Sequence, residues 1–292
     1  MDAVIRAIYL FGKLIKFSHT VFAMPFALSS VVLAHVHARP VTGRTLFWIL
    51  LAMVGARSAA MGFNRWADLY FDRLNPRTAS RPSVTGAISP RAILMLVIGF
   101  SVLFVLSAYK LGELCFWLSF PTLGVLFSYS YTKRFTAWSH IYLGLAIGLA
   151  PLGAWIAVTG SWDWRIVPLS LALLTYIAGF DILYACQDID FDRQIGLYSL
   201  PVKLGVRKAL LVSSILHCLT FVFLALLIPF FGLGKIYGFF LIIIGLLLIC
   251  EHRMVKPEDL SKVPVAFFHV NSIVSIALFA GVGLDVFYSI SR

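Results

Sequence analysis

The sequence has little charge for a chain of its length. Of its 292 residues, 13% are charged and 60% are hydrophobic, whereas ordinary soluble domains have about 25% charged residues. This composition excludes a soluble globular protein and indicates an integral membrane protein. The net charge of +11 would suggest a nucleic-acid partner in a soluble chain, but here the distribution of the basic residues accounts for it.

Cysteine is also scarce, and its spacing forms no motif. The four cysteines are scattered, without a CxxC pair or histidines at zinc spacing, which excludes a disulfide framework and a structural zinc site. His35 and His37 form an HxH pair in an expected loop, and two ligands alone do not make a metal site. No cleavable signal peptide is apparent, because basic residues flank the first apolar span and no small-residue cleavage site follows it, so we expect this span to remain as an anchor.

Long apolar stretches predict an all-α integral membrane protein with about nine transmembrane helices. Each stretch is near or above the roughly 20 residues that a helix needs to cross a bilayer. No soluble domain or long linker divides them, so we expect residues 1–292 to form a single transmembrane domain. The expected spans are about 17–36, 45–63, 92–109, 113–131, 137–158, 165–185, 208–231, 235–250 and 264–287.

The basic residues are distributed unequally between the two sides of such a bundle. If the chain begins in the cytoplasm, the cytoplasmic segments hold 17 of the 24 Lys and Arg residues, and the opposite side holds six. Cytoplasmic segments of membrane proteins are enriched in Lys and Arg. We therefore expect a bacterial inner membrane protein with a cytoplasmic N-terminus.

Six of the thirteen carboxylates lie in two short segments, the first aspartate segment (64–72) and the second aspartate segment (181–192). Acid in or beside a membrane is costly and points to a function. In each segment two aspartates stand four residues apart, so on a helix they share a face, where their charges repel. Mg²⁺ characteristically combines one or two carboxylates with phosphate oxygens, so the segments predict a diphosphate held through magnesium ions. The pairs are Asp68 with Asp72 and Asp188 with Asp192.

Other polar side chains accompany these pairs. Asn64 extends the first stripe to two turns and offers an amide oxygen to a metal, while Arg77 and Arg81 can bind phosphate oxygens bidentately. With these residues the segments become two Asp-rich loops, about 64–91 and 181–207, both on the cytoplasmic side. Because the loops are four helices apart, they indicate two four-helix halves whose Asp-rich loops meet over a central cavity.

Further ionisable residues are candidates for the same site. Asp181 lies two turns before Asp188 and deeper in the membrane, where it is a candidate for proton handling or for pairing with a lysine. Asp190 faces elsewhere and is expected to be solvated. Arg57 is expected to face the cavity and to bind Asp181, another acid or an anionic substrate, because an unpaired arginine at that depth is costly; a structural ion pair is the alternative. Lys133, at the cytoplasmic end of the fourth helix, is either a phosphate ligand or a lysine that extends to the interface.

These segments resemble the UbiA superfamily of intramembrane prenyltransferases, most closely its 4-hydroxybenzoate polyprenyltransferase branch. The family's first motif, NxxxDxxxD followed by RTxxRP, matches residues 64–82. Its second motif, an aromatic residue and DxxYAxxDxxxD followed by IG, matches 180–196, and its YxxxKRxT segment matches 129–136. The resemblance extends over nearly the whole chain. Ser130 stands where the 4-hydroxybenzoate enzymes often have proline, which leaves the acceptor less defined than the reaction.

The resemblance implies Mg²⁺-dependent transfer of a polyprenyl group from polyprenyl diphosphate to an aromatic acid, most closely 4-hydroxybenzoate, in ubiquinone or menaquinone biosynthesis. Each aspartate pair would hold one Mg²⁺, and basic side chains would neutralise the departing diphosphate. The resulting allylic cation would react with the ring carbon ortho to the phenol hydroxyl, with Asp181 assisting loss of the ring proton and Arg57 binding the acceptor's carboxylate. The implied catalytic residues are Asp68, Asp72, Asp188, Asp192, Asp181 and Lys133; the implied substrate-binding residues are Arg57, Asn64, Arg77, Arg81, Tyr129, Tyr184, Arg193 and Lys203; the implied metal ligands are Asn64, Asp68, Asp72, Asp188 and Asp192.

Three other functions stay open at this point. The acceptor can be a different aromatic acid on a menaquinone route, including the futalosine type. An ion-coupled transporter also binds cations at acids on interrupted helices, but it predicts acids at mid-membrane rather than beside arginines at one face. A phosphatidyl-alcohol transferase also uses Mg²⁺ at aspartates near a membrane surface, but it leaves the second segment unexplained.

Overall fold

The structure is a computed structural model that describes residues 10–15, 20 and 22–291. In this part of the chain all regular elements are helical and no strand occurs, which confirms the all-α class. Eight of the described helices are long and apolar enough to cross a membrane, as expected for an integral membrane protein, and the shorter apolar helix α2 (Met24–His37) has 14 residues. The count of nine spans is not confirmed, because the first expected span, 17–36, falls partly outside the described residues.

The chain divides into two compact units, and the first, unit 1, comprises Met1–Thr20 and Gly43–Tyr131. This grouping differs from the two four-helix halves expected from the sequence. The helices of unit 1 include α3 (Gly43–Ala67), α4 (Leu69–Leu74), α5 (Pro90–Leu111) and all but the last residue of α6 (Glu113–Thr132).

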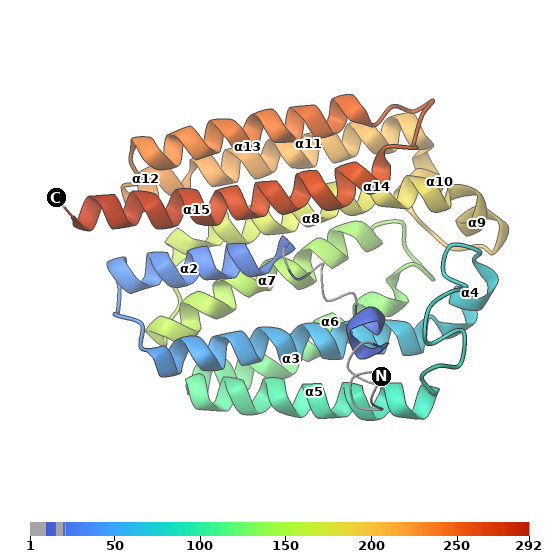
Figure 1. Ribbon diagram of the computed structural model, residues 1–292, viewed down its shortest axis with the longest axis horizontal. Helices are drawn as coiled ribbons and strands as arrows, with labels where there is room; N and C mark the ends of the chain where they lie inside the picture. The colour runs from blue at the N-terminus through green and yellow to red at the C-terminus, as the bar shows by residue number, and fades with distance from the viewer. Residues whose placement is uncertain (1–9, 16–19, 21, 292) are drawn as a thin grey trace. The chain divides into compact units, whose positions relative to one another are not determined.

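In unit 1, α3 and α5 lie side by side over much of their length (Figure 1). They approach closely at Gly55, where a side-chain Cβ would lie 2.9 Å from the backbone nitrogen of Phe104. Small residues permit such close helix contacts in membranes. Phe63 of α3 stacks on Phe127 of α6, with 4.5 Å between the ring centroids. These contacts fix the end of α3, which carries the first aspartate segment.

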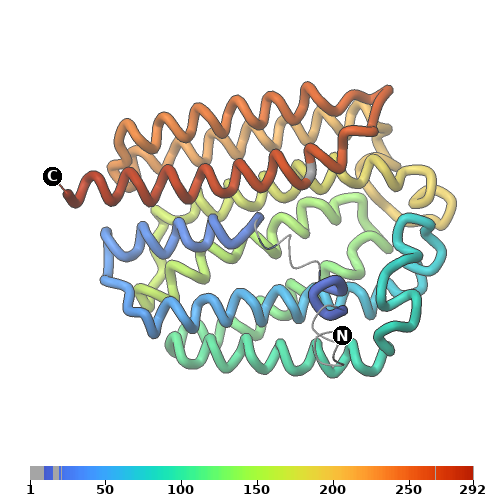
Figure 2. The backbone as a smooth tube through the Cα atoms, in the orientation of Figure 1, coloured from blue at the N-terminus to red at the C-terminus, as the bar shows by residue number. Residues whose placement is uncertain are grey.

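The second compact unit, unit 2, comprises Val21–Thr42 and Thr132–Arg292 and contains α2. Its course can be followed along the tube in Figure 2. The other helical elements of unit 2 are α7 (Ser139–Thr159), η2 (Trp164–Ile166), α8 (Val167–Ala185), η3 (Cys186–Asp188), α9 (Ile189–Gln194), α10 (Leu200–Leu204), α11 (Val206–Ala225), α12 (Leu227–Phe231), α13 (Lys235–Met254), α14 (Val263–Val265), η4 (Ala266–Val270) and α15 (Asn271–Ile290).

Helix α8 is the most buried membrane helix of unit 2 and packs between α7 and α11. Its contact with α7 rests on a GxxxG pair, Gly144 and Gly148. A Cβ at Gly144 would clash with the backbone oxygen of Leu174, and one at Gly148 would lie 3.0 Å from the backbone oxygen of Ser170. The two helices therefore touch through their backbones, as small-residue motifs allow in membranes.

Because of this close contact, we expect valine to lower the stability of the protein at one glycine of α7 and not at another. Gly144→Val should cost about 1–3 kcal/mol of stability, because the neighbouring atom is backbone and cannot rotate away. Gly153→Val is the matched control, since nothing lies within 4 Å of a Cβ built at Gly153. Thermal unfolding of the detergent-purified variants measures the difference, and equal midpoints for the two valine variants would contradict the contact.

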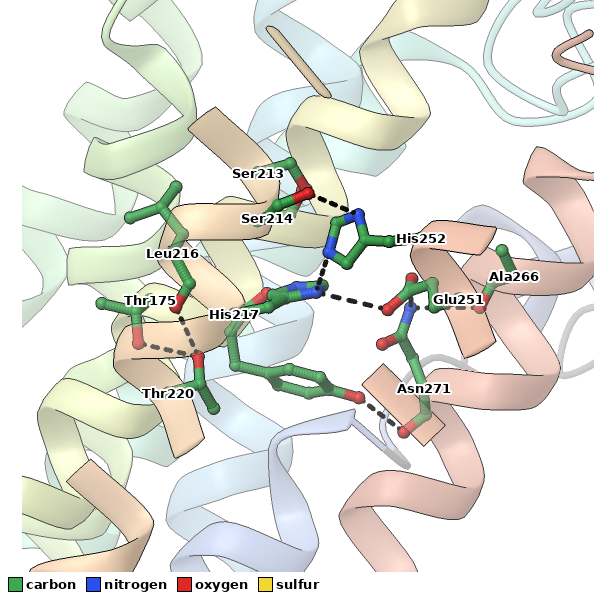
Figure 3. A network of polar contacts seen from close by, with 12 residues as sticks. Thr175, Ser213, Ser214, Leu216, His217, Thr220, Glu251, His252, Ala266 and Asn271 are labelled. Carbon is green, nitrogen blue, oxygen red and sulfur yellow. Dashed lines mark hydrogen bonds and ion pairs between the residues drawn. The ribbon is translucent and has the colours of Figure 1, made fainter. Parts of the chain in front are cut away.

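A buried polar network joins α11, α13 and α15 in unit 2 (Figure 3). His217 Nδ1 lies 2.9 Å from Nε2 of His252 and 3.4 Å from Oε2 of Glu251. Asn271 donates a hydrogen bond of 3.0 Å to the other oxygen of Glu251, and Ser214 contacts His252 at 3.1 Å. Polar contacts between membrane helices hold them in register, so this network fixes three helices relative to one another.

The same network holds the end of α8 that leads to the second aspartate segment. Since a carbonyl only accepts, His217 Nε2 donates to the backbone oxygen of Tyr176 at 3.3 Å, and Ser213 donates to that of Gly179 at 2.7 Å. A Cβ at Gly179 would overlap the ring of His217. The backbone two residues before Asp181 is therefore clamped against α11.

Candidate active site

The first aspartate segment lies where α3 ends and the six-residue helix α4 begins. Asp68 occupies the break between them, with φ −93° and ψ 8°, in the sparsely populated region where many active-site residues occur. The helical hydrogen bonds continue across it, from the Asp68 amide to the Asn64 oxygen (2.9 Å) and from the Asp72 amide to the Asp68 oxygen (2.8 Å). Asn64, Asp68 and Asp72 are therefore connected by helix-type hydrogen bonds from one residue to the fourth after it, although the helix is interrupted at Asp68.

Asp72 is buried between two arginines of unit 1. Arg81 donates to its Oδ1, and Arg65 lies 3.8 Å from its Oδ2. Within the described residues, Oδ2 is buried and has no hydrogen-bond partner. Thr78 donates a hydrogen bond of 2.7 Å to the Asp72 backbone oxygen, which fixes the turn after α4. A buried carboxylate oxygen without a donor has coordination capacity left for a cation.

Asn64 orients the other aspartate of the pair. Its Nδ2 donates to Asp68 Oδ2 at 2.7 Å and to Ser130 at 3.4 Å, while its Oδ1 accepts from Arg65 at 3.1 Å. The sequence interpretation missed Arg65. It stands seven residues before Asp72, and that spacing, which places two residues on one helical face, could have identified it.

The second aspartate segment repeats this local geometry in unit 2. Asp188 stands between η3 and α9 with φ −103° and ψ 7°, and α9 again has six residues. Asp192, like Asp72, is buried at the fourth position of its short helix. Lys133 lies 3.4 Å from Asp192 Oδ2, so this buried aspartate also has a cation beside it. We call Asp68 and Asp188, the aspartates at the two helix breaks, the pivot aspartates. Both have the same backbone conformation, and each is followed one turn later by a buried aspartate.

Asp181, one side chain of the second segment, contacts a residue that the sequence interpretation missed. His140 of α7 lies with Nδ1 2.7 Å from Asp181 Oδ2, and its side chain is fully buried whereas that of Asp181 is 20% exposed. The two residues are 41 positions apart, and only the close packing of α7 on α8 brings them together. No sequence spacing signals such a pair.

The remaining predicted residues lie at or near the surface of their own unit. Arg57 is partly buried in α3 of unit 1, whereas Asp181 belongs to unit 2, so their pairing stays a prediction. Asp190 is exposed, as expected for a solvated carboxylate. The exposed basic residues are Arg77, Arg193 and Lys203, and the partly buried tyrosines are Tyr129 and Tyr184.

The donor atoms of both segments suit a hard cation. In the described part of the chain no three His, Cys, Asp or Glu side chains are grouped closely enough to hold a metal by themselves. Mg²⁺ does not need such a cage, since it commonly binds one or two carboxylates together with phosphate oxygens and water. The all-oxygen donors of the two segments fit this mode, as does Asp72 Oδ2, which has no hydrogen-bond partner among the described residues.

The family model and the similar curated proteins point to the same protein family. Residues 23–273 match the UbiA prenyltransferase family. A 4-hydroxybenzoate octaprenyltransferase of Nitrosomonas eutropha is 32% identical over 241 residues, which cover 81% of this chain and 82% of that protein. The enzyme of the same name from Xanthomonas oryzae pv. oryzae is also 32% identical, over 82% of this chain and 80% of that protein.

Solved structures show the same fold. A UbiA homologue from Aeropyrum pernix K1, in its apo form, is similar with a TM-score of 0.83 and 33% identity, covering 91% of this chain and 98% of that one. A UbiA homologue from Archaeoglobus fulgidus bound to DMAPP and Mg²⁺ has a TM-score of 0.71 and 22% identity, covering 94% of this chain and 98% of that one. At that identity the second likeness shows the fold alone.

Proposed function

The chain belongs to the UbiA prenyltransferase family, and on this premise we propose that it transfers a polyprenyl group from polyprenyl diphosphate to the ring of an aromatic acid, most closely 4-hydroxybenzoate. It is a polyprenyltransferase with several membrane-spanning helices. The observation that carries the proposal is the repeated geometry of the two segments, in which a pivot aspartate precedes a buried aspartate that has a cation beside it.

The donor's diphosphate is proposed to bind through Mg²⁺ at both segments. The ligands would be Asn64, Asp68 and Asp72 for one ion and Asp188 and Asp192 for another. Bound Mg²⁺ would neutralise and orient the diphosphate, which raises its quality as a leaving group. The Archaeoglobus fulgidus homologue bound to DMAPP and Mg²⁺, and the same homologue bound to GPP and Mg²⁺, support this pairing of diphosphate and cation.

Basic side chains of the chain are proposed to take up the negative charge that develops on the diphosphate as its bond to the allylic carbon breaks. Fixed cations stabilise such charge without having to reorient during the reaction. Lys133 and Arg81 are held beside buried aspartates and are therefore preorganised for this role. The exposed residues proposed to assist are Arg77, Arg193 and Lys203.

The allylic carbon is proposed to react with the ring carbon ortho to the acceptor's hydroxyl. The new C–C bond leaves that ring carbon with a proton, whose loss to Asp181 returns the C–H electron pair to the ring. Arg57 is proposed to bind the acceptor's carboxylate, and Tyr129 and Tyr184 are proposed to contact the substrates. The side chain of Asp181 is 20% exposed, which supports its assignment as the proton acceptor.

The cellular setting is proposed from the charge distribution and the relatives. Residues 1–292 would act as one transmembrane domain in a bacterial inner membrane, with the N-terminus and both Asp-rich loops on the cytoplasmic side. The prenylated acid would feed ubiquinone or menaquinone biosynthesis, and the relatives are named as 4-hydroxybenzoate octaprenyltransferases. A different aromatic acid, on a futalosine-type menaquinone route, is the second candidate, because Ser130, where 4-hydroxybenzoate enzymes often have proline, contacts Asn64.

An acceptor panel tests the proposed function. Membranes containing the protein are incubated with Mg²⁺, labelled polyprenyl diphosphate and one aromatic acid at a time. Prenylated 4-hydroxybenzoate would support 4-hydroxybenzoate as the acceptor. Product with another acid alone would support the second candidate, a different aromatic acid. Membranes without the protein provide the background. No prenylated product with any acid would contradict the proposed reaction.

A further inference from the structure

His140 is a fully buried histidine that the proposed reaction does not yet use. It lies in the first turn of α7, and its imidazole contacts two different segments of unit 2. Nδ1 lies 2.7 Å from Asp181 Oδ2, and Nε2 lies 3.5 Å from the backbone nitrogen of Leu200. The contact uses only Oδ2 of Asp181, and among the described residues no hydrogen bond to the other oxygen, Oδ1, occurs. The Asp181 side chain is 20% exposed.

The contacts specify how the ring is protonated. The Leu200 amide can only donate, so Nε2 faces it as the acceptor and the single ring proton of a neutral imidazole belongs on Nδ1. Nδ1–H therefore donates to Asp181, and a carboxylate is an acceptor on both oxygens. Among the described residues no hydrogen bond to Asp181 Oδ1 occurs, so this oxygen is left as an acceptor while Oδ2 is held by His140.

Neighbouring contacts hold the histidine itself in place. The Tyr198 amide donates to the backbone oxygen of Lys133 at 2.8 Å, so the loop before α10 is fastened to the segment that leads into α7. This loop brings Leu200 against His140 and follows directly after α9, the helix that carries Asp192. Lys133, His140 and Asp181 are therefore linked within unit 2 by direct contacts that include the loop after the second aspartate segment.

We propose that His140 is a positioning residue for the prenyl transfer, which orients the Asp181 carboxylate so that Oδ1 receives the ring proton. This inference rests on the proposed function. After the C–C bond forms, the C–H bond of the ring carbon breaks, its electron pair restores the aromatic ring, and the proton moves to Asp181 Oδ1. His140 keeps its own proton on Nδ1 throughout and makes no contact with the reacting atoms.

Two substitutions separate this role from simple packing. His140→Leu keeps a similar volume and removes the donor, and it should lower kcat by about 10–100-fold, the usual effect of losing an orienting partner, while KM for polyprenyl diphosphate stays within about twofold. His140→Asn can still donate from about the position of Nδ1 and should recover most of the rate. In an Asp181→Asn background, His140→Leu should add less than about a twofold loss. An equal loss in both backgrounds, or an unchanged kcat in His140→Leu, would overturn the proposal.

A spectroscopic measurement tests the contact without relying on turnover. In protein labelled with ¹⁵N-histidine, the resonances that disappear in His140→Leu should report a neutral ring protonated at Nδ1. Protonation at Nε2 alone would sink the inference, whatever the activity. If wild-type protein transfers no prenyl group to any aromatic acid, the proposed function fails, and the ¹⁵N result still decides the His140–Asp181 contact by itself.

Discussion

Asp188→Ala is expected to reduce prenyl transfer by about 10³-fold, whereas Asp190→Ala, two residues away, leaves the rate within about twofold of wild type. Asp188 is buried at the pivot between η3 and α9, while Asp190 is exposed on α9. Removing a group that stabilises charge in the transition state typically costs about 10²–10³ in rate, and loss of a metal ligand also weakens binding of the diphosphate. Initial rates with labelled donor at saturating Mg²⁺ measure the difference.

Asp68→Ala should behave as Asp188→Ala does, because the two residues share one backbone conformation in their own units. Raising the Mg²⁺ concentration should not restore either variant fully, since each loses a ligand oxygen. Thermal unfolding of the three variants provides the control for folding. A well-folded Asp188→Ala enzyme with wild-type turnover would show that the second segment does not hold the diphosphate.

Lys133→Ala is expected to lower kcat by about 10²-fold. The ammonium lies 3.4 Å from the buried carboxylate of Asp192 and is one-third exposed, so it can both orient that carboxylate and reach a bound anion. Lys133→Arg keeps the charge and should retain part of the rate, although the planar guanidinium does not reproduce a compact ammonium.

The matched control for Lys133 is Lys208→Ala, which removes one exposed positive charge at the start of α11. It should leave kcat near wild type, because it lies outside both aspartate segments. Steady-state kinetics with varied polyprenyl diphosphate separates binding from turnover. Equal losses in the two lysine variants would mean that the rate responds to overall positive charge rather than to Lys133.

The apolar helices could be predicted from the sequence, but the breaks in the backbone at the two aspartate segments could not. The expected spans 113–131 and 137–158 agree within a few residues with α6 and α7, because a run of apolar residues of bilayer length has few alternatives. The breaks at Asp68 and Asp188 were not predicted. A four-residue spacing of aspartates is compatible with a continuous helix, and the sequence alone carries no sign that the backbone turns at the first aspartate of each pair.

The candidate site was predicted where its residues follow one another in the chain. The aspartate pairs, Asn64 and Arg81 were identified by spacing, and the structure places Arg81 on Asp72. His140 was missed because its partner, Asp181, is distant in sequence and meets it only through the glycine contact between α7 and α8. Contacts between residues distant in sequence depend on which helices pack together. Hydrophobic periodicity does not show which helices are neighbours in the fold, so it could not predict this contact.

The repeated pivot and buried aspartates also argue against reading the acids as an ordinary charged surface. Exposed carboxylates beside a membrane need no cation within a few ångströms, yet Asp72 and Asp192 are both buried and both have one. Burial of an ionised group is costly unless partners compensate it. The same costly arrangement occurs in both units, which supports the proposed binding of a diphosphate through Mg²⁺.

The proposed reaction forms a carbon–carbon bond between a polyprenyl group and an aromatic acid, with Mg²⁺ holding the diphosphate. The most direct measurement is mass spectrometry of the products that purified protein makes from polyprenyl diphosphate and 4-hydroxybenzoate, with Mg²⁺ and after removal of divalent ions by a chelator. We expect a ring-prenylated acid with Mg²⁺, none after chelation, and recovery when Mg²⁺ is returned. Undiminished product in the chelated sample would contradict this expectation.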